Sequence, residues 1–325
     1  MQKSHHHVHH HWNTLSRVVC HLAIYTIIVS SRVASLGSSA GRVVYIENLR
    51  CLRLPASEIL EPPAPPLVLL SGTAQTVNSW VGHYPFLSRH REVLCVELRG
   101  QGPPREASNS PLPCLGDVGL SAQVDDLENL FAATGLSDTP VDICGFSFGG
   151  RVAISFAAAH PRSVRKVAAT SIGLRRGSFG RLALAQWNAC LSSQNDEHEV
   201  LKIFAWASLF ATHHPRFLAK HEKRVEQWVN LVAAGNTRAG LLALLDQTHN
   251  GDDSAMADAA ARCREASVDG LLLYGTEDRL LDPSSVPDLA REAGFRSVQF
   301  DDCAHAIPLE VPLIWRKEVL SFLDS

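Results

Sequence analysis

The segment Gly145-Phe146-Ser147-Phe148-Gly149 matches the pattern G-x-S-x-G, whose central serine can act as a nucleophile. Such a serine lies on a sharp strand-to-helix turn, and the flanking glycines are needed because a Cβ atom there would collide with neighbouring backbone. The pattern alone is weak, since chance supplies a match in roughly one chain in ten of this length. Its setting is more specific, because the apolar run 141–144 precedes it and a helical pattern, 148–159, follows it. We therefore predict that Ser147 is a nucleophile, the alternative being a solvated serine in a glycine-rich turn.

A serine nucleophile needs a base, and the base needs a carboxylate to orient it. With this motif the acid follows the serine in the chain, and the histidine follows the acid. Asp278 comes after the apolar run 271–274, at a predicted strand end, and His305 lies in a later loop. We predict Asp278 as the acid and His305 as the base. Glu277 is the rival acid, and the alternatives are a turn aspartate and a structural histidine.

The same chemistry needs two backbone N–H groups that stabilise the oxyanion of the tetrahedral intermediate. One donor is predicted to be Phe148, directly after the serine. The other should come from the loop 71–74, which follows the apolar run 67–70. Gly72 allows a close turn there, so Thr73 is the predicted second donor, and an ordinary glycine turn is the alternative.

The elements that must position these residues alternate between short apolar runs and helical patterns. This alternation predicts an α/β fold with a doubly wound, mostly parallel sheet. The predicted strands are 43–46, 49–54, 67–70, 93–98, 141–144, 166–171, 268–274 and 297–300, and the predicted helices that alternate with them are 79–89, 121–133, 148–159 and 309–323.

Residues from about 174 to 250 contain no clear strand pattern. We predict four helices there, 179–191, 199–210, 215–234 and 239–248, which form a cap inserted into one domain spanning 41–325. Aromatic residues of this segment could line an acyl pocket, but core packing is the favoured interpretation for any one of them. They are Trp187, Phe204, Trp206, Phe210 and Trp228.

The first 40 residues have a different composition from the rest. No acidic residue precedes Glu47, and the apolar stretch 18–29 is too short for a confident membrane span. A secretory signal and an organelle transit peptide both fit this pattern, and a disordered tail is the alternative. Residues 1–40 are therefore left out of the fold prediction, and no stable membrane insertion is expected of the domain that follows.

Composition narrows the classes of function. The net charge of −3 is spread along the chain, without the basic stripe that a nucleic-acid-binding surface needs. Eight cysteines are present, but Cys95 and Cys144 fall in apolar runs typical of buried strands, so reduced thiols are expected. No metal or organic cofactor is implied.

Taken together, the motifs resemble those of the α/β-hydrolase superfamily, in its capped branch of esterases, lactonases and thioesterase-like enzymes. The resemblance runs from about residue 67 to the C-terminus and rests on the segments 69–72, 78–80, 96–102, 145–150 and 275–278 and on His305. It departs from the usual pattern at Ser71, where the family generally has histidine, and at Gln101, where histidine is also frequent.

This resemblance implies a serine hydrolase that cleaves a carboxylic ester or thioester through an acyl-enzyme. The alternatives are acyl transfer by the same triad and a ligand-binding receptor built on the hydrolase fold. A fainter similarity, in residues 304–308 and in Arg175, Arg176 and Arg181, is to esterases that act on carrier-protein-linked acyl esters. Arginines on a solvated helix face are the favoured interpretation of that cluster.

Overall fold

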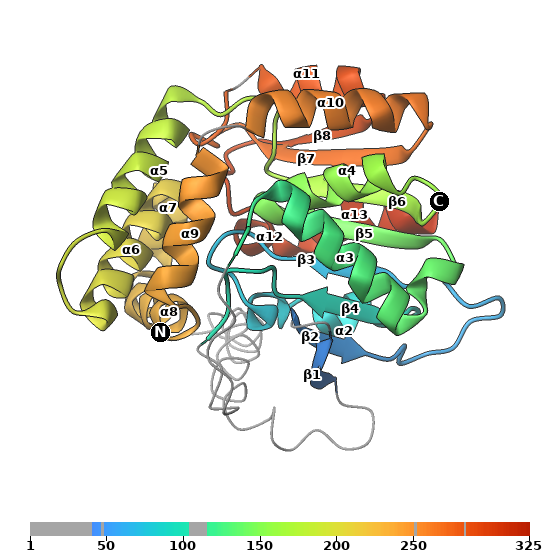
Figure 1. The fold of residues 1–325 in the computed structure, drawn as a ribbon, viewed down its shortest axis with the longest axis horizontal. Helices are drawn as coiled ribbons and strands as arrows, with labels where there is room; N and C mark the ends of the chain where they lie inside the picture. Colours follow the sequence, from blue (N-terminus) through green and yellow to red (C-terminus); the bar gives the residue numbers. More distant parts are fainter. Residues whose placement is uncertain (1–40, 47–48, 104–115, 250–251, 283) are drawn as a thin grey trace, which may run out of the picture. The chain divides into compact units, whose positions relative to one another are not determined.

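The computed structural model describes residues 41–46, 49–103, 116–249, 252–282 and 284–325. Residues Arg42–Ser325 form one compact unit, which is shown in Figure 1. The predicted leader, 1–40, lies outside the described residues, and so do residues 47–48, between the first two predicted strands. No helix in the described ranges has the length and apolar character needed to cross a membrane.

Eight strands form a single sheet in the order β1-β2-β4-β3-β5-β6-β7-β8. The strands are β1 Arg42–Ile46, β2 Leu49–Leu54, β3 Leu67–Leu70, β4 Val93–Val96, β5 Val141–Phe146, β6 Val164–Thr170, β7 Asp269–Gly275 and β8 Arg296–Phe300. β2 runs antiparallel to both of its neighbours, and every other pairing is parallel. The predicted doubly wound, mostly parallel sheet is therefore confirmed.

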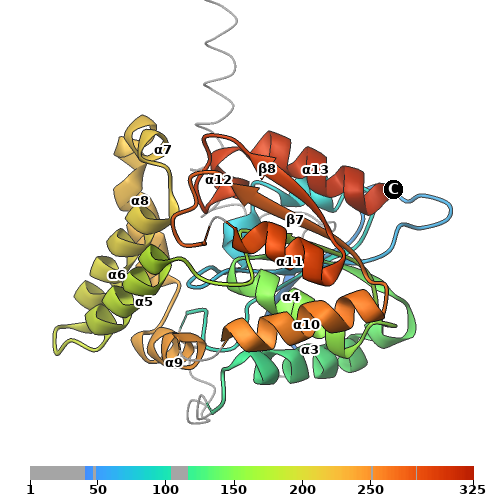
Figure 2. The same ribbon diagram turned by 90° about the horizontal axis from the view of Figure 1, so that it is seen from above.

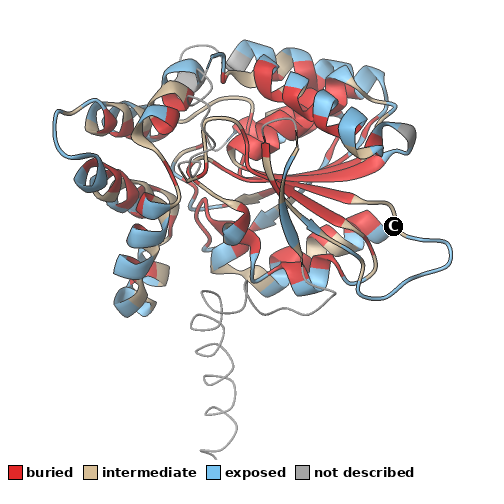
Figure 3. Cartoon of the chain, turned by 60° about the horizontal axis from the view of Figure 1, so that its bottom comes forward, coloured by how far each residue is buried: buried red, intermediate tan, exposed pale blue. Residues whose placement is uncertain are grey.

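Helices cover both faces of this sheet (Figure 2). Alternate residues of a strand point to opposite faces and so belong to different cores. Val68 and Leu70 belong to the core that contains helices α3 (Leu120–Thr134), α4 (Phe148–Ala159), α10 (Asp252–Glu265) and α11 (Ser285–Ala293). Leu67 and Leu69 belong to the opposite core, with the 3-10 turn η1 (Val77–Trp80) and helices α2 (Tyr84–Leu87), α12 (Ile307–Glu310) and α13 (Pro312–Asp324). Figure 3 shows the result, a buried sheet between half-exposed helices.

Five helices connect β6 to α10, and they lie together at one side of the sheet (Figure 1). They are α5 Ser178–Leu191, α6 Glu197–Thr212, α7 Pro215–Lys220, α8 Glu222–Ala234 and α9 Arg238–His249. The core shared by α5, α6, α8 and α9 contains Trp187, Phe204 and Leu241. We call α5–α9 the helical insertion.

Three helix predictions were wrong in extent. The expected helix 79–89 is only η1 and the single turn α2, because Pro85 has no N–H to donate to a helical hydrogen bond and is tolerated only in the first turn of a helix, where it lies in α2. The expected helix 215–234 breaks at His221, whose ring contacts Phe217 and Trp228. The expected helix 309–323 begins earlier and is divided at Val311 into α12 and α13.

Two helices were missed, α10 and α11. The buried face of α10 is made of Met256, Ala259, Ala260 and Cys263, spaced as a helix requires. Most of these side chains are small and only weakly hydrophobic, so the sequence showed no clear apolar stripe for this helix. α10 packs against α4, so these small residues let the two helices approach closely.

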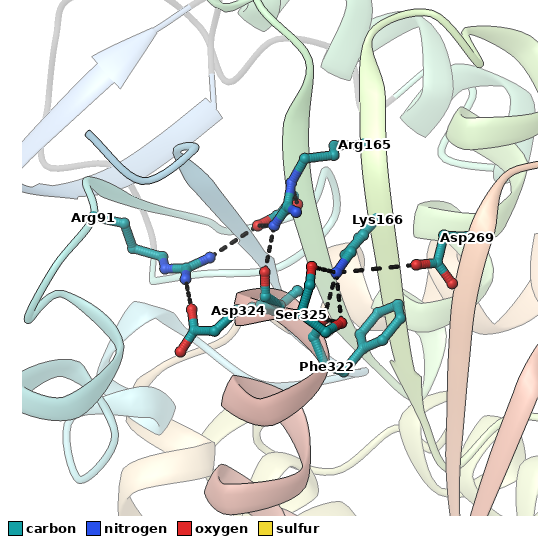
Figure 4. A network of polar contacts seen from close by, with 9 residues as sticks. Arg91, Arg165, Lys166, Asp269, Phe322, Asp324 and Ser325 are labelled. Carbon is teal, nitrogen blue, oxygen red and sulfur yellow. Dashed lines mark hydrogen bonds and ion pairs between the residues drawn. The ribbon is translucent and has the colours of Figure 1, made fainter. Parts of the chain in front are cut away.

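A buried polar network fastens the last helix to the amino ends of the central strands (Figure 4). Asp142 of β5 is fully buried and accepts hydrogen bonds from Arg91 (2.8 Å) and Arg165 (2.8 and 2.6 Å). Arg165 also donates to the carbonyl of Leu323 (2.5 Å), and Lys166 donates to the carbonyl of Phe322 (2.7 Å). These two cations satisfy carbonyls at the C-terminal end of α13, where positive charge is favoured.

We predict that Asp142→Asn destabilises the protein by about 3–5 kcal/mol, because it removes the anion that compensates two buried or half-buried guanidinium groups. Urea unfolding followed by circular dichroism measures the change. Asp269→Asn is the matched control, since that carboxylate is 47% exposed and lies 4.0 Å from Lys166. It should cost about 0–1 kcal/mol, and equal losses in the two variants would contradict the assignment.

Candidate active site

Ser147 lies at a strained turn between β5 and α4. Its backbone angles are φ 52° and ψ −119°, a conformation that residues other than glycine rarely adopt. Its N–H donates to the carbonyl of Thr170 on the neighbouring strand (2.8 Å), and its own carbonyl accepts from Gly150 (2.9 Å). The turn therefore holds the serine between the carboxyl end of the sheet and the start of a helix, as its motif predicted. We call residues 145–149 the elbow.

The glycines of the elbow are required by close backbone contacts. A Cβ atom on Gly145 would lie 2.3 Å from the carbonyl oxygen of Gly149. A Cβ on Gly149 would lie 2.3 Å from the carbonyl oxygen of Leu70, at the end of β3. Neither contact can be relieved by rotating a side chain, so the elbow and β3 fix each other's positions.

The structure brings Ser147, His305 and Asp278 together in one hydrogen-bonded chain. The Ser147 hydroxyl lies 2.9 Å from Nε2 of His305, and Nδ1 of His305 lies 2.7 Å from Oδ2 of Asp278. The other Asp278 oxygen accepts from the N–H of Leu280 (3.0 Å). The His305 and Asp278 side chains are 5% and 2% exposed, so little water competes for these bonds. Glu277, the rival acid, is exposed, and no hydrogen bond of its side chain to His305 is found in the described chain.

The loop that carries His305 is held from two directions. The Ser171 hydroxyl, just after β6, donates to the carbonyl of His305 (2.6 Å). The N–H of Ala306 donates to the carbonyl of Thr212 at the end of α6 (3.0 Å). The ring of Phe146 lies beside the imidazole, with ring centroids 5.4 Å apart. The histidine is therefore positioned by the sheet and by the helical insertion together.

The loop 71–74 lies directly against the elbow. A Cβ on Gly72 would lie 3.2 Å from Cβ of Ser147 and 2.8 Å from the Phe146 ring. The Gly72 N–H donates to Oε1 of Gln75 (3.0 Å), whereas no hydrogen bond of the Thr73 N–H occurs among the described residues. The same holds for the N–H of Phe148, at the first position of α4. Both predicted oxyanion donors are thus available beside the serine, and Gln75 is a partner of this loop that the sequence did not reveal.

The two departures from the family pattern have different surroundings. Ser71 is fully buried and accepts a hydrogen bond from the Trp80 indole N–H (2.9 Å). It therefore fastens η1 to the end of β3. The amide of Gln101 is buried, and within the described ranges neither its oxygen nor its nitrogen has a hydrogen-bond partner.

Of the aromatic residues in the helical insertion, Trp187 and Phe204 are buried and contact each other edge to face, with ring centroids 5.8 Å apart. Trp206 and Phe210 are stacked on each other but are 37% and 57% exposed. Trp228 stacks on Phe217. None of these contacts places an aromatic ring against Ser147, which favours core packing for the buried members.

The arginines near the start of the insertion are engaged within the protein. Arg175 donates to Asp288 of α11 (2.6 Å), and Arg181 donates to the carbonyl of Arg176 (2.7 Å). Their charges are therefore partly used to join the insertion to the sheet domain. His213, a histidine close to the site, stays neutral at pH 7 because burial lowers its pKa to about 4.

No group of three or more His, Cys, Asp or Glu side chains in the described chain is arranged to hold a metal ion. The six cysteines in these ranges are free thiols, and burial raises the pKa of both Cys95 and Cys144 to about 12. A small hollow adjoins the elbow and the His305 loop. It is lined by Gln75, Ser79, Trp80, Phe146, Pro308 and Leu309.

Comparison with known proteins gives one family match and several relatives. The model of the alpha/beta hydrolase family matches residues 67–314. A pimeloyl-[acyl-carrier protein] methyl ester esterase of Neisseria meningitidis is 29% identical over 60% of this chain and 74% of its own. A monoacylglycerol lipase of Homo sapiens is 21% identical over 80% of this chain and 76% of its own.

Solved structures are similar in fold. An enol-lactonase from Burkholderia xenovorans superposes with a TM-score of 0.69 at 20% identity, over 87% of this chain and all of its own. A hydrolase from Pseudomonas aeruginosa gives a TM-score of 0.69 at 23% identity, over 89% of this chain and all of its own. These likenesses cover the sheet and both helical layers.

The strain at Ser147 predicts an unusual order of stability. Ser147→Gly should be more stable than Ser147→Ala by about 1 kcal/mol, because glycine relieves about 1–3 kcal/mol of backbone strain and costs about 0.5–1 kcal/mol in chain entropy. Thermal and urea unfolding measure the difference. Ser208, inside α6, is the control position. There the glycine variant should be less stable than the alanine variant by about 1 kcal/mol, and the same order at both positions would disprove the strain argument.

Proposed function

The chain belongs to the alpha/beta hydrolase family, and we propose that it is a serine hydrolase that cleaves a carboxylic ester or thioester through an acyl-enzyme. The proposed triad is Ser147, His305 and Asp278, and the proposed oxyanion donors are the N–H groups of Phe148 and Thr73. The observation that carries the proposal is the continuous hydrogen-bonded chain from the serine hydroxyl to the buried aspartate.

In the proposed mechanism, Nε2 of His305 takes the proton of the Ser147 hydroxyl while the serine oxygen attacks the substrate carbonyl. The carbonyl oxygen becomes negative and is stabilised by the two backbone N–H groups. Asp278 stabilises the imidazolium, which then gives its proton to the leaving alcohol or thiol. Water attacks the resulting acyl-enzyme with His305 again as base, and the acid product and free Ser147 are released.

Features around the triad support this chemistry. The Ser147 hydroxyl is presented at the positive N-terminal end of α4, which favours a developing negative charge. The N–H groups of Phe148 and Thr73, which have no hydrogen-bond partner among the described residues, directly follow Ser147 and Gly72, and a Cβ on Gly72 would lie 3.2 Å from Cβ of Ser147. Donors held in place by the packing of the elbow would be preorganised for the oxyanion.

The relatives support an ester as the substrate, since one is named for cleaving a methyl ester and another is named a monoacylglycerol lipase. We propose a small-molecule acyl ester or thioester, with no nucleic-acid partner. We also propose that the predicted cap, about residues 174–250, which contains the helical insertion, helps to shape the acyl site. A role in carrier-protein recognition is weakened by the internal contacts of Arg175 and Arg181.

Ser147→Ala is expected to lower kcat on p-nitrophenyl esters by at least about 10³-fold, because it removes the nucleophile. The assay uses a series from acetate to decanoate, with labelling by a fluorophosphonate probe as a second measurement. Peptide mass spectrometry should locate the label on Ser147. A wild-type protein that neither turns over any ester nor takes the label would favour a binding role and refute the proposal.

The acid is tested by a matched pair of substitutions. Asp278→Asn should lower kcat by about 10⁴-fold, because the amide cannot stabilise the imidazolium or hold the required tautomer. Glu277→Gln should keep near wild-type activity, since that exposed side chain is not bonded to His305. The opposite result, with only Glu277→Gln inactive, would make Glu277 the acid.

A further inference from the structure

Glu310, the last residue of α12, accepts hydrogen bonds from two segments that are far apart in the sequence. Its Oε2 accepts from the N–H of Ala304 (3.1 Å) and from the thiol of Cys303 (3.5 Å). Its Oε1 accepts from the N–H of His214 (2.7 Å). The carboxylate therefore lies between the His305 loop and the helical insertion and is bonded to both.

These bonds lie close to the reacting histidine. Ala304 directly precedes His305, and Ala306 directly follows it. On the following side, the Ala306 N–H donates to the carbonyl of Thr212 (3.0 Å). The junction between α6 and α7, residues 212–214, is thus joined to the His305 loop on both sides of the imidazole, once directly and once through Glu310.

We propose that Glu310 is a positioning residue that fastens the His305 loop to the α6–α7 junction and so sets the distance from Nε2 of His305 to Ser147. The inference rests on the proposed role of His305 as base. A carboxylate suits this position because both of its oxygens accept, so two N–H groups from different segments can be bonded at once. An amide has one accepting end and one donating end, and it would set a donor against one of those N–H groups.

We expect the bonds of Glu310 to affect the placement of the His305 loop and not the folding of the domain. The His305 carbonyl is bonded to Ser171 and Nδ1 is bonded to Asp278, and neither bond involves Glu310. Loss of the Glu310 bonds should therefore leave the fold intact but loosen the approach of His305 to the serine. A small misplacement of a catalytic base can lower the rate by about 10–100-fold.

The sharpest test compares His214→Pro with His214→Ala. Proline removes the N–H that donates to Glu310, and the native angles at His214, φ −66° and ψ 134°, suit it. The preceding residue, His213, is extended (φ −110°, ψ 150°), as a residue before proline prefers. Both variants lose the side chain that caps the Arg216 N–H, so they differ chiefly in the bond to Glu310.

We expect His214→Pro to lower kcat on a p-nitrophenyl ester by about 10-fold relative to His214→Ala, with KM changed by less than about twofold. Active-site titration with a fluorophosphonate gives the number of competent sites. A positioning role lowers the rate per titrated site, whereas a merely structural role lowers the number of titrated sites and leaves that rate unchanged. The second pattern, or equal rates in the two variants, would overturn the proposal.

Glu310→Gln tests the carboxylate itself. Glu318→Gln, on α13, is the control, because it makes the same change of carboxylate to amide away from the His305 loop. Glu310→Gln should lower the rate per site, and Glu318→Gln should not. Hydrogen exchange measured by mass spectrometry supplies a readout independent of turnover. Exchange in peptides covering 301–306 should rise in Glu310→Gln and His214→Pro and stay unchanged in the two controls.

This design keeps the two proposals distinct. If the wild-type protein neither hydrolyses esters nor takes the label, the proposed function fails, and hydrogen exchange still decides whether Glu310 holds the loop. If the wild-type protein is active but Glu310→Gln matches it in rate per site and in exchange, the proposed function stands and the role of Glu310 is refuted.

Discussion

The backbone of the elbow is the constraint on which the rest of the site depends. Ser147 is held at a positive φ angle that costs free energy, and it keeps that conformation because Gly145, Gly149 and Leu70 pack backbone against backbone around it. The same packing sets the position of the loop after β3, because Gly72 touches the elbow with no room for a side chain. One set of steric contacts therefore places the proposed nucleophile and the proposed oxyanion donors together.

The histidine is positioned in a different way, by hydrogen bonds instead of backbone packing. His305 follows β8, at the edge of the parallel sheet, and bonds to Ser171 and Asp278 are among those that hold its loop close to Ser147. α13 begins shortly after this loop and is anchored to the centre of the sheet, where the Trp315 indole N–H donates to Thr170 (2.9 Å). The Asp142 network holds the other end of the same helix. Contacts far from the site thus limit how far the His305 loop can move.

The sequence predicted those parts of the site that depend on local pattern. The apolar run before Ser147 and the helical run after it were enough to place the elbow, and chain order was enough to select Asp278 and His305. The contacts of Glu310 could not be read in this way, because His214 lies 96 residues away and donates through its backbone. Backbone donors exist at nearly every position, so a sequence does not show which of them a carboxylate will meet.

Strands that are continuous apolar runs were predicted from the sequence, whereas a helix whose buried face consists mostly of small residues was missed. β3 and α4 have the predicted limits, since each is bounded by glycine, proline or a sharp change in pattern. α10 was missed because Ala259, Ala260 and Cys263 bury its inner face with little apolar area. The segment 79–89 was predicted as one helix, but Pro85 has no N–H to continue the backbone hydrogen bonds of a helix through this position. The pattern of apolar residues therefore predicts which face of an element is buried better than it predicts whether the backbone can form a continuous helix.

The helical insertion is hydrogen-bonded to the site at more than one point. These bonds limit which changes in the insertion could alter the substrate without disturbing the reaction. The Asn236 amide donates to the carbonyl of Ala74 (3.0 Å), next to the proposed oxyanion donor Thr73. The Thr212 carbonyl accepts from Ala306, next to His305. The insertion is therefore bonded to the loops that flank Ser147 on both sides. Side chains facing the substrate can vary without disturbing the reaction, provided that the bonds made by Asn236 and Thr212 persist, because these bonds hold backbone rather than substrate.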